Sequence, residues 1–356
     1  MSKHIKSVGM GMFLAVALLA GCGPDKDTDG TEQPAASARC DDSSADYLAF
    51  DVNNHKPQDD RLTAIDAMVA MFTAAESDPS TAATQATALL AKYQDPSTNL
   101  QAKVKGREDK HFTGDAAAVG PALDKTITDA IEALRVATTK PEVSLAKQSF
   151  QKAGIYRFLY LSVMEELYEP SFEHYDEAYG YLGTGASNAE AGRRSLAKVA
   201  TSRDADNGTT LSTELFSLMK EGSCLIETAL KAKGTDSMEF GDDENYARFV
   251  QRFDAKLQSV LVYTMGHELH EIDLDQGSPD KAYLELVETE GVFRTIEPYL
   301  KLSAGSARAN LAAELRTAFD AALAKARAGD TTWIADFKAG ELLGKLETVF
   351  AIDVKN

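Results

Sequence analysis

Apolar residues recur at helical spacing along nearly all of the chain from Tyr47 onwards. Leu62, Ile65, Val69 and Phe72 follow one another at intervals of three and four, which places them on one face of a helix. Alternating apolar and polar runs, which are typical of strands, are nearly absent, and Ala, Leu, Glu and Lys dominate. The pattern therefore predicts an all-α fold, built as a large helix bundle or as two packed bundle-like halves.

Prolines, glycines and polar runs divide this pattern into separate helices. Pro121 suits the first turn of one helix, and another is expected to stop before Pro170. Residues 95–120 contain Pro96 and three glycines and are expected to form a loop, and residues 202–210 a polar break. After the first helix, the expected helices cover residues 82–93, 121–139, 142–168, 172–182, 188–201, 211–233, 243–274, 279–301, 306–327 and 333–352.

The first residues have the layout of a bacterial lipoprotein signal. Two lysines precede an apolar run from Val8 to Leu19, and Leu-Ala-Gly stands directly before Cys22. Cleavage before Cys22 and acylation of its thiol would hold the chain in a lipid membrane, because each buried methylene contributes about 0.8 kcal/mol. The alternative is an ordinary signal peptide with an incidental cysteine.

The expected domain organisation has three parts. Residues 1–21 form the signal peptide, 22–45 a disordered tether and 46–356 the helical domain, with halves at 46–203 and 204–356. The tether has too few apolar side chains to offset the entropy of ordering, and its residues 23–39 would span roughly 20–25 Å. Gly23, after the acylated cysteine, is compatible with sorting to the outer membrane, so we expect a location in the bacterial cell envelope.

Charge and cysteine content narrow the classes of partner. The formal charge of −18 becomes −20 once Lys3 and Lys6 are removed, which argues against nucleic acid and favours cations or basic partners. With Cys22 taken by lipid, Cys40 and Cys224 remain in an oxidising compartment, and we predict that they form a disulfide. The alternative is two free thiols.

The first candidate site is a histidine pair on the expected helix 243–274. His267 lies beside His270 and Glu271 on a helix, and two imidazoles with a carboxylate can ligate iron, copper or zinc. The spacing is not that of a zinc protease, which needs histidines four apart. This helix is apolar on two faces, so we expect it to lie centrally. The alternatives are a hydrogen-bonded structural pair or plain exposure.

The second candidate site lies on the expected helix 172–182. His174 and Glu177 share a face with Tyr181, and Glu173 and Glu177 repel unless a cation lies between them. Carboxylates also suit the start of a helix, so a solvated acidic helix start is the alternative. For the metal-binding hypothesis, we expect the helices of His174 and His267 to face each other.

A third segment, residues 285–299, carries further charges. Glu285 and Glu288 lie on one face, and Glu290 lies near Arg294. The simplest reading of Glu290 and Arg294 is a helix salt bridge, and a buried pair would support the core or the site. The sequence contains no phosphate-binding glycine loop, no Gly-x-Ser-x-Gly elbow and no cysteine cluster for zinc, so we assign no catalytic residue.

The run His-Tyr-Asp-Glu-Ala-Tyr-Gly-Tyr-Leu-Gly at residues 174–183 resembles the signature of imelysin-like lipoproteins. It is most similar to an uncharacterised set catalogued as domain of unknown function 4856, where the run reads His-Trp-Asp-Glu-Ala-Phe-Gly-Tyr-Phe-Gly. Asp60-Arg61-Leu62 and Thr289-Glu290-Gly291-Val292-Phe293 are similar to an opening and a late segment of that set.

The resemblance implies an all-helical envelope lipoprotein linked to the handling of iron, haem or copper. The relatives carry a Gly-x-His-x-x-Glu motif, of which His174 and Glu177 match the last two residues while Phe172 replaces the glycine. A histidine expected before the late segment is missing, with Leu286 near that place. Both departures weaken the transfer of a metal role.

Three functions follow from these observations. The first is an envelope-anchored lipoprotein that binds a metal ion or metal-containing ligand for iron or copper uptake, together with an outer-membrane or envelope transport protein. The second is a non-catalytic envelope scaffold or adaptor. The third, a metal-dependent peptidase as imelysins were once described, is disfavoured by the absence of a protease motif.

Overall fold

The computed structural model describes residues 39–40, 47–109, 116–183, 195–302 and 305–355. Within those ranges every regular element is helical, apart from one isolated antiparallel bridge between Ser171 and Ser237. The predicted signal peptide, Cys22 and most of the expected tether lie outside the described residues. Among the described helices, none combines the length and the apolar character needed to cross a bilayer.

The all-α prediction is confirmed. The elements are α1 (Lys56–Ser77), η1 (Pro79–Thr81), α2 (Ala82–Tyr93), α3 (Leu100–Lys105), η2 (Ala116–Ala118), α4 (Val119–Val136), α5 (Lys140–Gln148), η3 (Ser149–Ile155), α6 (Tyr156–Leu167), α7 (Phe172–Leu182), α8 (Leu196–Asn207), α9 (Leu211–Lys233), α10 (Glu244–Leu274), α11 (Pro279–Lys301), α12 (Ala307–Arg327), α13 (Trp333–Phe337) and α14 (Ala339–Phe350).

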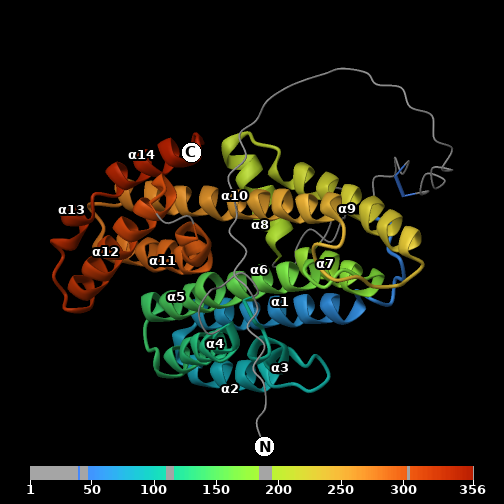
Figure 1. Cartoon of the computed structure of the whole chain (residues 1–356). Coiled ribbons are helices and arrows are strands. Elements are labelled where there is room, and N and C mark those ends of the chain that lie inside the picture. Colours follow the sequence, from blue (N-terminus) through green and yellow to red (C-terminus); the bar gives the residue numbers. More distant parts are fainter. Residues whose placement is uncertain (1–38, 41–46, 110–115, 184–194, 303–304, 356) are drawn as a thin grey trace, which may run out of the picture. The chain divides into compact units, whose positions relative to one another are not determined.

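Helix α10 lies at the centre of the helical unit. It packs against α6, α8, α9, α11 and α14, and it crosses above α1, α5 and α6 in Figure 1. Val260, Leu261, Met265 and Leu269 on this helix are fully buried. The prediction that a helix with two apolar faces occupies a central position is therefore confirmed.

The segment expected to form one helix over residues 142–168 is interrupted in the structure. Helix α5 passes into the π-helical turn η3, which passes into α6. Gly291 of α11 packs directly on η3, since a Cβ at Gly291 would lie 2.9 Å from the backbone nitrogen of Ala153. The small residue thus permits close approach of α11 to η3 and positions the charged side chain of Lys152 between helices.

The polar break expected at residues 202–210 is wrong in part, because α8 continues to Asn207. Asp204 in its last turn accepts hydrogen bonds from the backbone nitrogens of Leu211 (2.6 Å) and Ser212 (2.9 Å), which begin α9. A polar run at this place therefore serves to cap the following helix. Residues 36–356 form one compact unit, so Asp204 does not mark a boundary between compact units.

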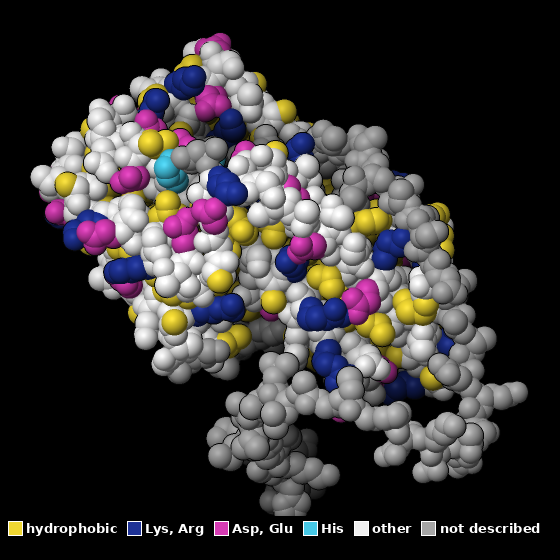
Figure 2. Space-filling view, turned by 90° about the horizontal axis from the view of Figure 1, so that it is seen from above, with side chains coloured by type: hydrophobic (Ala, Val, Ile, Leu, Met, Phe, Trp, Pro, Cys, Tyr) yellow, Lys and Arg dark blue, Asp and Glu magenta, His cyan; other side chains and the backbone are white. Residues whose placement is uncertain are grey.

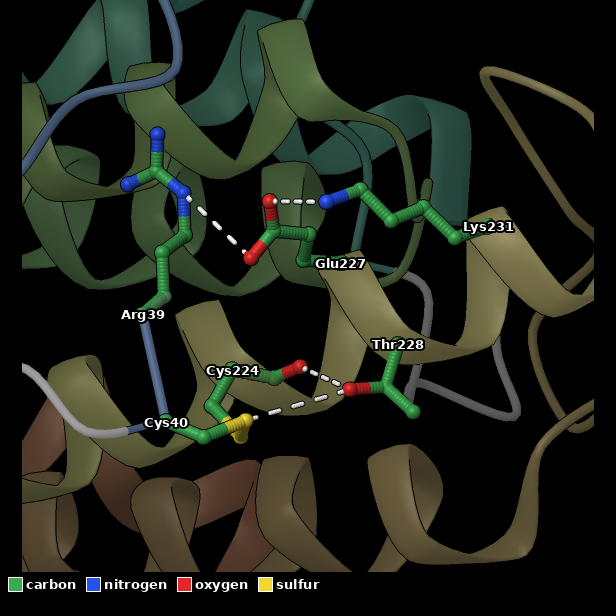
Figure 3. The surroundings of a disulfide bond; sticks show 6 residues. All are labelled: Arg39, Cys40, Cys224, Glu227, Thr228 and Lys231. Carbon is green, nitrogen blue, oxygen red and sulfur yellow. Dashed lines mark hydrogen bonds and ion pairs between the residues drawn. A yellow bond between two sulfur atoms is a disulfide. The ribbon is translucent and has the colours of Figure 1, made fainter. Parts of the chain in front are cut away.

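The predicted disulfide is confirmed. Cys40 and Cys224 are bonded, with Cα atoms 4.8 Å apart, and Figure 3 shows the bond beside α9. Arg39 lies 3.8 Å from the carboxylate of Glu227, which also pairs with Lys231 at 2.8 Å. The disulfide and this ion pair fasten the start of the compact unit to the middle of α9.

Acidic and basic side chains are interspersed on the face of the molecule shown in Figure 2. The large negative charge of the chain therefore does not produce an area of one sign on that face. An electrostatic argument about function must accordingly rest on local groups of side chains rather than on the net charge.

Candidate functional site

Several residues of the run 174–183 are accounted for by packing. The Tyr175 hydroxyl donates to the carbonyl oxygen of Met219 at 2.6 Å. A Cβ at Gly180 would lie 2.8 Å from the Cβ of Gln58, so this glycine lets α7 approach α1. Gly183 ends α7 with φ of +94°, a conformation that L side chains rarely adopt. These residues therefore stabilise the packing and the end of α7 and have no need of a ligand to explain them.

Asp176 also has a structural role. Its carboxylate is fully buried and accepts hydrogen bonds from the Tyr47 hydroxyl (2.9 Å), the backbone nitrogens of Phe50 (3.0 Å) and Asp51 (2.8 Å), and the Asn54 amide (3.0 Å). Burial raises the pKa of Asp176, and these hydrogen bonds oppose that rise. Asp176 thereby ties the segment that precedes α1 to α7.

Replacing Asp176 with alanine is expected to lower the free energy of unfolding by about 3 kcal/mol, because buried donors lose a charged acceptor. Urea denaturation of the two proteins measures the difference. Glu173→Ala on the exposed side of the same helix is the matched control and should change the value by less than about 0.5 kcal/mol. Equal effects of the two substitutions would contradict this role of Asp176.

His174 lies against the end of α6. The Ser171 side chain caps α7 by accepting a hydrogen bond from the backbone nitrogen of His174 at 3.0 Å, which orients the first turn. The Nδ1 atom of His174 is then 3.3 Å from a carboxylate oxygen of Glu169 and 3.6 Å from one of Glu166. This nitrogen is shielded from solvent and has no hydrogen-bond partner within the described residues.

Glu166 is the buried acidic group of this site. Burial raises the pKa of Glu166 to about 7, the nearby Arg107 lowers it, and Glu177 and Glu165 raise it further. Glu177, which lies one turn from His174 on α7, is one of the groups that raise the pKa of Glu166. Glu166 and Glu169 were not predicted as site residues, because only the chain reversal between the two helices brings them to His174.

Tyr181 does not support His174 as predicted. Its hydroxyl accepts hydrogen bonds from Arg61 at 2.9 Å and from Arg107 at 2.8 Å. Arg107 also pairs with Glu165 at 3.0 Å and with Glu166 at 3.1 Å. Tyr181 therefore holds the guanidinium group of Arg107, which offsets the negative charge of Glu166. The predicted support from Glu173 is likewise not seen, because this side chain is exposed.

The histidine pair of α10 has different surroundings. The Nδ1 atom of His267 is shielded and bonds no acceptor or donor in the described part of the chain. Burial lowers the pKa of His267, and the nearby Arg203 lowers it further, so the imidazole is neutral at pH 7. The carboxylates of Glu271 and Asp206 act to raise the pKa of His267. A guanidinium neighbour disfavours the metal site predicted at His267, His270 and Glu271.

The expectation that His174 and His267 face each other is wrong. Tyr175, next to His174, packs near Tyr246 at the start of α10, with ring centroids 6.4 Å apart. His267 follows Tyr246 by 21 residues (267 − 246), which is about 30 Å at 1.5 Å per residue of helix. The two histidines therefore belong to separate regions of the fold.

The structure gathers a buried carboxylate group that the sequence did not indicate as a site. Oxygens of Glu268, Glu285 and Glu288 lie within 4.8 Å of one another. The ammonium group of Lys152 is 2.9 Å from Glu268 and 3.2 Å from Glu288. Burial and the hydrogen bond that protonated Glu285 donates to Glu268 raise the pKa of Glu285 to about 9, so Glu285 is protonated at pH 7.

Lys152 and the proton on Glu285 offset most of the negative charge of this group, so we assign it a structural role between η3, α10 and α11. Lys152 gave no signal in the sequence, because it lies more than 110 residues from its partners. Glu290 and Arg294 form the predicted helix salt bridge, and Arg316 of α12 joins Glu290 at 2.8 Å. Glu290 therefore joins α11 to α12, and none of the described ion pairs connects Glu290 or Arg294 with His174.

No family model, curated protein or solved structure matches this chain. The likeness to imelysin-like lipoproteins stays a prediction, and the argument about function rests on the geometry around His174.

Proposed function

We propose that the protein is a lipid-anchored binding protein of the cell envelope that holds a divalent transition-metal ion at His174. The observation that carries this proposal is the shielded Nδ1 atom of His174, which has no hydrogen bond within the described residues and lies beside carboxylate oxygens of Glu169 and Glu166. An unprotonated imidazole nitrogen repels carboxylates, and either a proton on that nitrogen or a metal ion between the groups removes the repulsion. Glu177, one turn along α7, is the fourth candidate ligand.

The two distances from the Nδ1 atom of His174 are those expected between neighbouring ligands of one ion. Nitrogen and oxygen ligands that lie 2.0–2.1 Å from a tetrahedral metal are about 3.4 Å from each other. The Nδ1 atom of His174 is 3.3 Å from Glu169 and 3.6 Å from Glu166. Imidazole with carboxylates suits zinc, copper or iron.

Two further features support a role in uptake at the envelope. The expected acylation of Cys22 would place the helical domain near a membrane, where an outer-membrane or envelope transport protein is the natural partner. The likeness of residues 174–183 to imelysin-like lipoproteins points to the same class of ligand.

Metal binding by the purified chain tests the proposal. Titration calorimetry with Zn²⁺, Cu²⁺ and Fe²⁺ is expected to show one site for at least one of these ions. His174→Ala should weaken that site by about 100-fold, since a ligand is lost. His267→Ala is the matched control, a half-buried histidine remote from the site, and should leave the affinity unchanged.

The pH dependence of the same titration gives a second readout. Glu166, with a pKa of about 7, must release its proton to bind the ion, so the affinity should fall as the pH is lowered from 8 to 6. Glu166→Gln should weaken binding and flatten part of this dependence. Absence of a stoichiometric site, or equal loss in the His174→Ala and His267→Ala proteins, would overturn the proposal.

A further inference from the structure

A small cavity of about 120 Å³ lies between α8, the junction of η3 with α6, and α10. Its wall carries the cationic side chains of Lys152, Lys198 and Arg203. Four residues that carry hydroxyl groups also line it: Tyr156, Ser195, Ser202 and Thr264. None of the described residues that line the cavity is a carboxylate, although acidic residues outnumber basic ones in the chain.

Arg203 has unused hydrogen-bond donors at this cavity. Its Nη2 atom pairs with Asp206 at 2.9 Å. Its Nε and Nη1 atoms are shielded from solvent and have no acceptor within the described residues. Buried N–H groups are nearly always paired in folded proteins, because leaving one unpaired costs as much as a lost hydrogen bond. The guanidinium group therefore lacks an acceptor on the side away from Asp206.

Among the cations at the cavity wall, Lys198 is the one that no described carboxylate offsets. Lys152 pairs with Glu268 and Glu288, so it lines the cavity but its charge is already offset by carboxylates. Lys198 is exposed and forms none of the ion pairs between described residues. The pKa of the neighbouring His267 is lowered by burial and by Arg203, which places the guanidinium group of Arg203 near this imidazole. Lys198 and the unused face of Arg203 are thus available to an anion.

We propose that this cavity binds a small oxyanion of the phosphate class. A volume of 120 Å³ holds about four waters, which suits a group of about five heavy atoms and excludes a larger organic ligand. The planar fork of a guanidinium matches the oxygens of such an anion. Ser195 is the N-cap of α8, so backbone N–H groups of the first turn of this twelve-residue helix add donors at the same place.

Inorganic phosphate is the probe for the test. Titration of the full chain with phosphate, in the presence of a chelator, is expected to show one saturable site with a dissociation constant in the millimolar range or below. Sodium chloride at equal ionic strength should give no such site. The chelator removes metal ions, so the result does not depend on the site at His174.

Variants locate the site. Arg203→Gln is expected to weaken phosphate binding by at least about tenfold. Lys198→Gln, at an exposed position that does not endanger folding, should weaken it by a few-fold. The matched control is Arg248→Gln, an exposed guanidinium on α10 that should leave binding unchanged. No saturable phosphate site, or an affinity that is the same in the Lys198→Gln protein as in the parent, would overturn the proposal.

Discussion

Replacement of Lys152 by methionine is expected to lower the free energy of unfolding by about 3–5 kcal/mol. The side chain of Lys152 is only 12% exposed, and its ammonium group lies between Glu268 and Glu288. Without this charge, buried carboxylates face one another and must take up protons or water. Urea denaturation at pH 8 measures the loss, because deprotonated carboxylates are most frequent there.

An exposed lysine supplies the control for this substitution. Lys125 pairs with Asp129 at 2.6 Å on the surface of α4, and Lys125→Met is expected to cost less than about 1 kcal/mol. A loss of less than 1 kcal/mol in the Lys152→Met protein would contradict the assignment of this group as a structural ion-pair network.

The same group makes the stability of the parent protein depend on pH. The pKa values of Glu285 and Glu288 are raised to about 9 and about 7, above the value of an unfolded glutamate, so the folded protein binds more protons. Their contribution to stability is present below pH 4.5 and is lost as the pH rises through 7 to 9. In the Glu285→Gln protein, the decrease in the free energy of unfolding near pH 9 should disappear, and the decrease near pH 7 should remain.

Loss of the Cys40–Cys224 disulfide is expected to lower the free energy of unfolding by about 4 kcal/mol. The bond joins residues 184 positions apart, and a crosslink over so long a segment strongly restricts the unfolded chain. The double variant Cys40→Ser, Cys224→Ser measures the effect by its urea midpoint.

Chemical reduction provides the control for the disulfide. The parent protein treated with dithiothreitol should reach the midpoint of the double variant, and the double variant should not respond to dithiothreitol. An unchanged midpoint after complete reduction would show that the bond adds nothing to stability. In that case the ion pair of Arg39 with Glu227 would be the contact that holds the start of the compact unit.

Helix positions were predicted best where the signal is local. Helices α2, α7, α9 and α11 begin and end at the predicted residues, since apolar periodicity and flanking glycines or prolines act within one or two turns. The predicted helix boundaries were wrong where contacts between residues far apart in the sequence determine the backbone conformation. Residues 333–352 form two helices because Lys338 adopts a φ of +53°, which no local pattern required.

The site was predicted only in part. His174 and Glu177 were identified because a helix brings residues three apart together. Glu166 and Glu169 reach His174 through the reversal of the chain between α6 and α7, and Arg203 approaches His267 through the packing of α8 near α10. These pairings lie beyond the reach of spacing along one helix.

By itself the sequence determined the helical character of the chain, the bounds of most helices and the two cysteines that pair. These properties depend on backbone hydrogen bonds and apolar faces within single helices, or on a choice between very few partners. Only the tertiary structure decided which ionisable groups meet, because such contacts join residues that are many turns apart. It separated His174 from His267, placed Lys152 among three glutamates and left Arg203 facing a cavity.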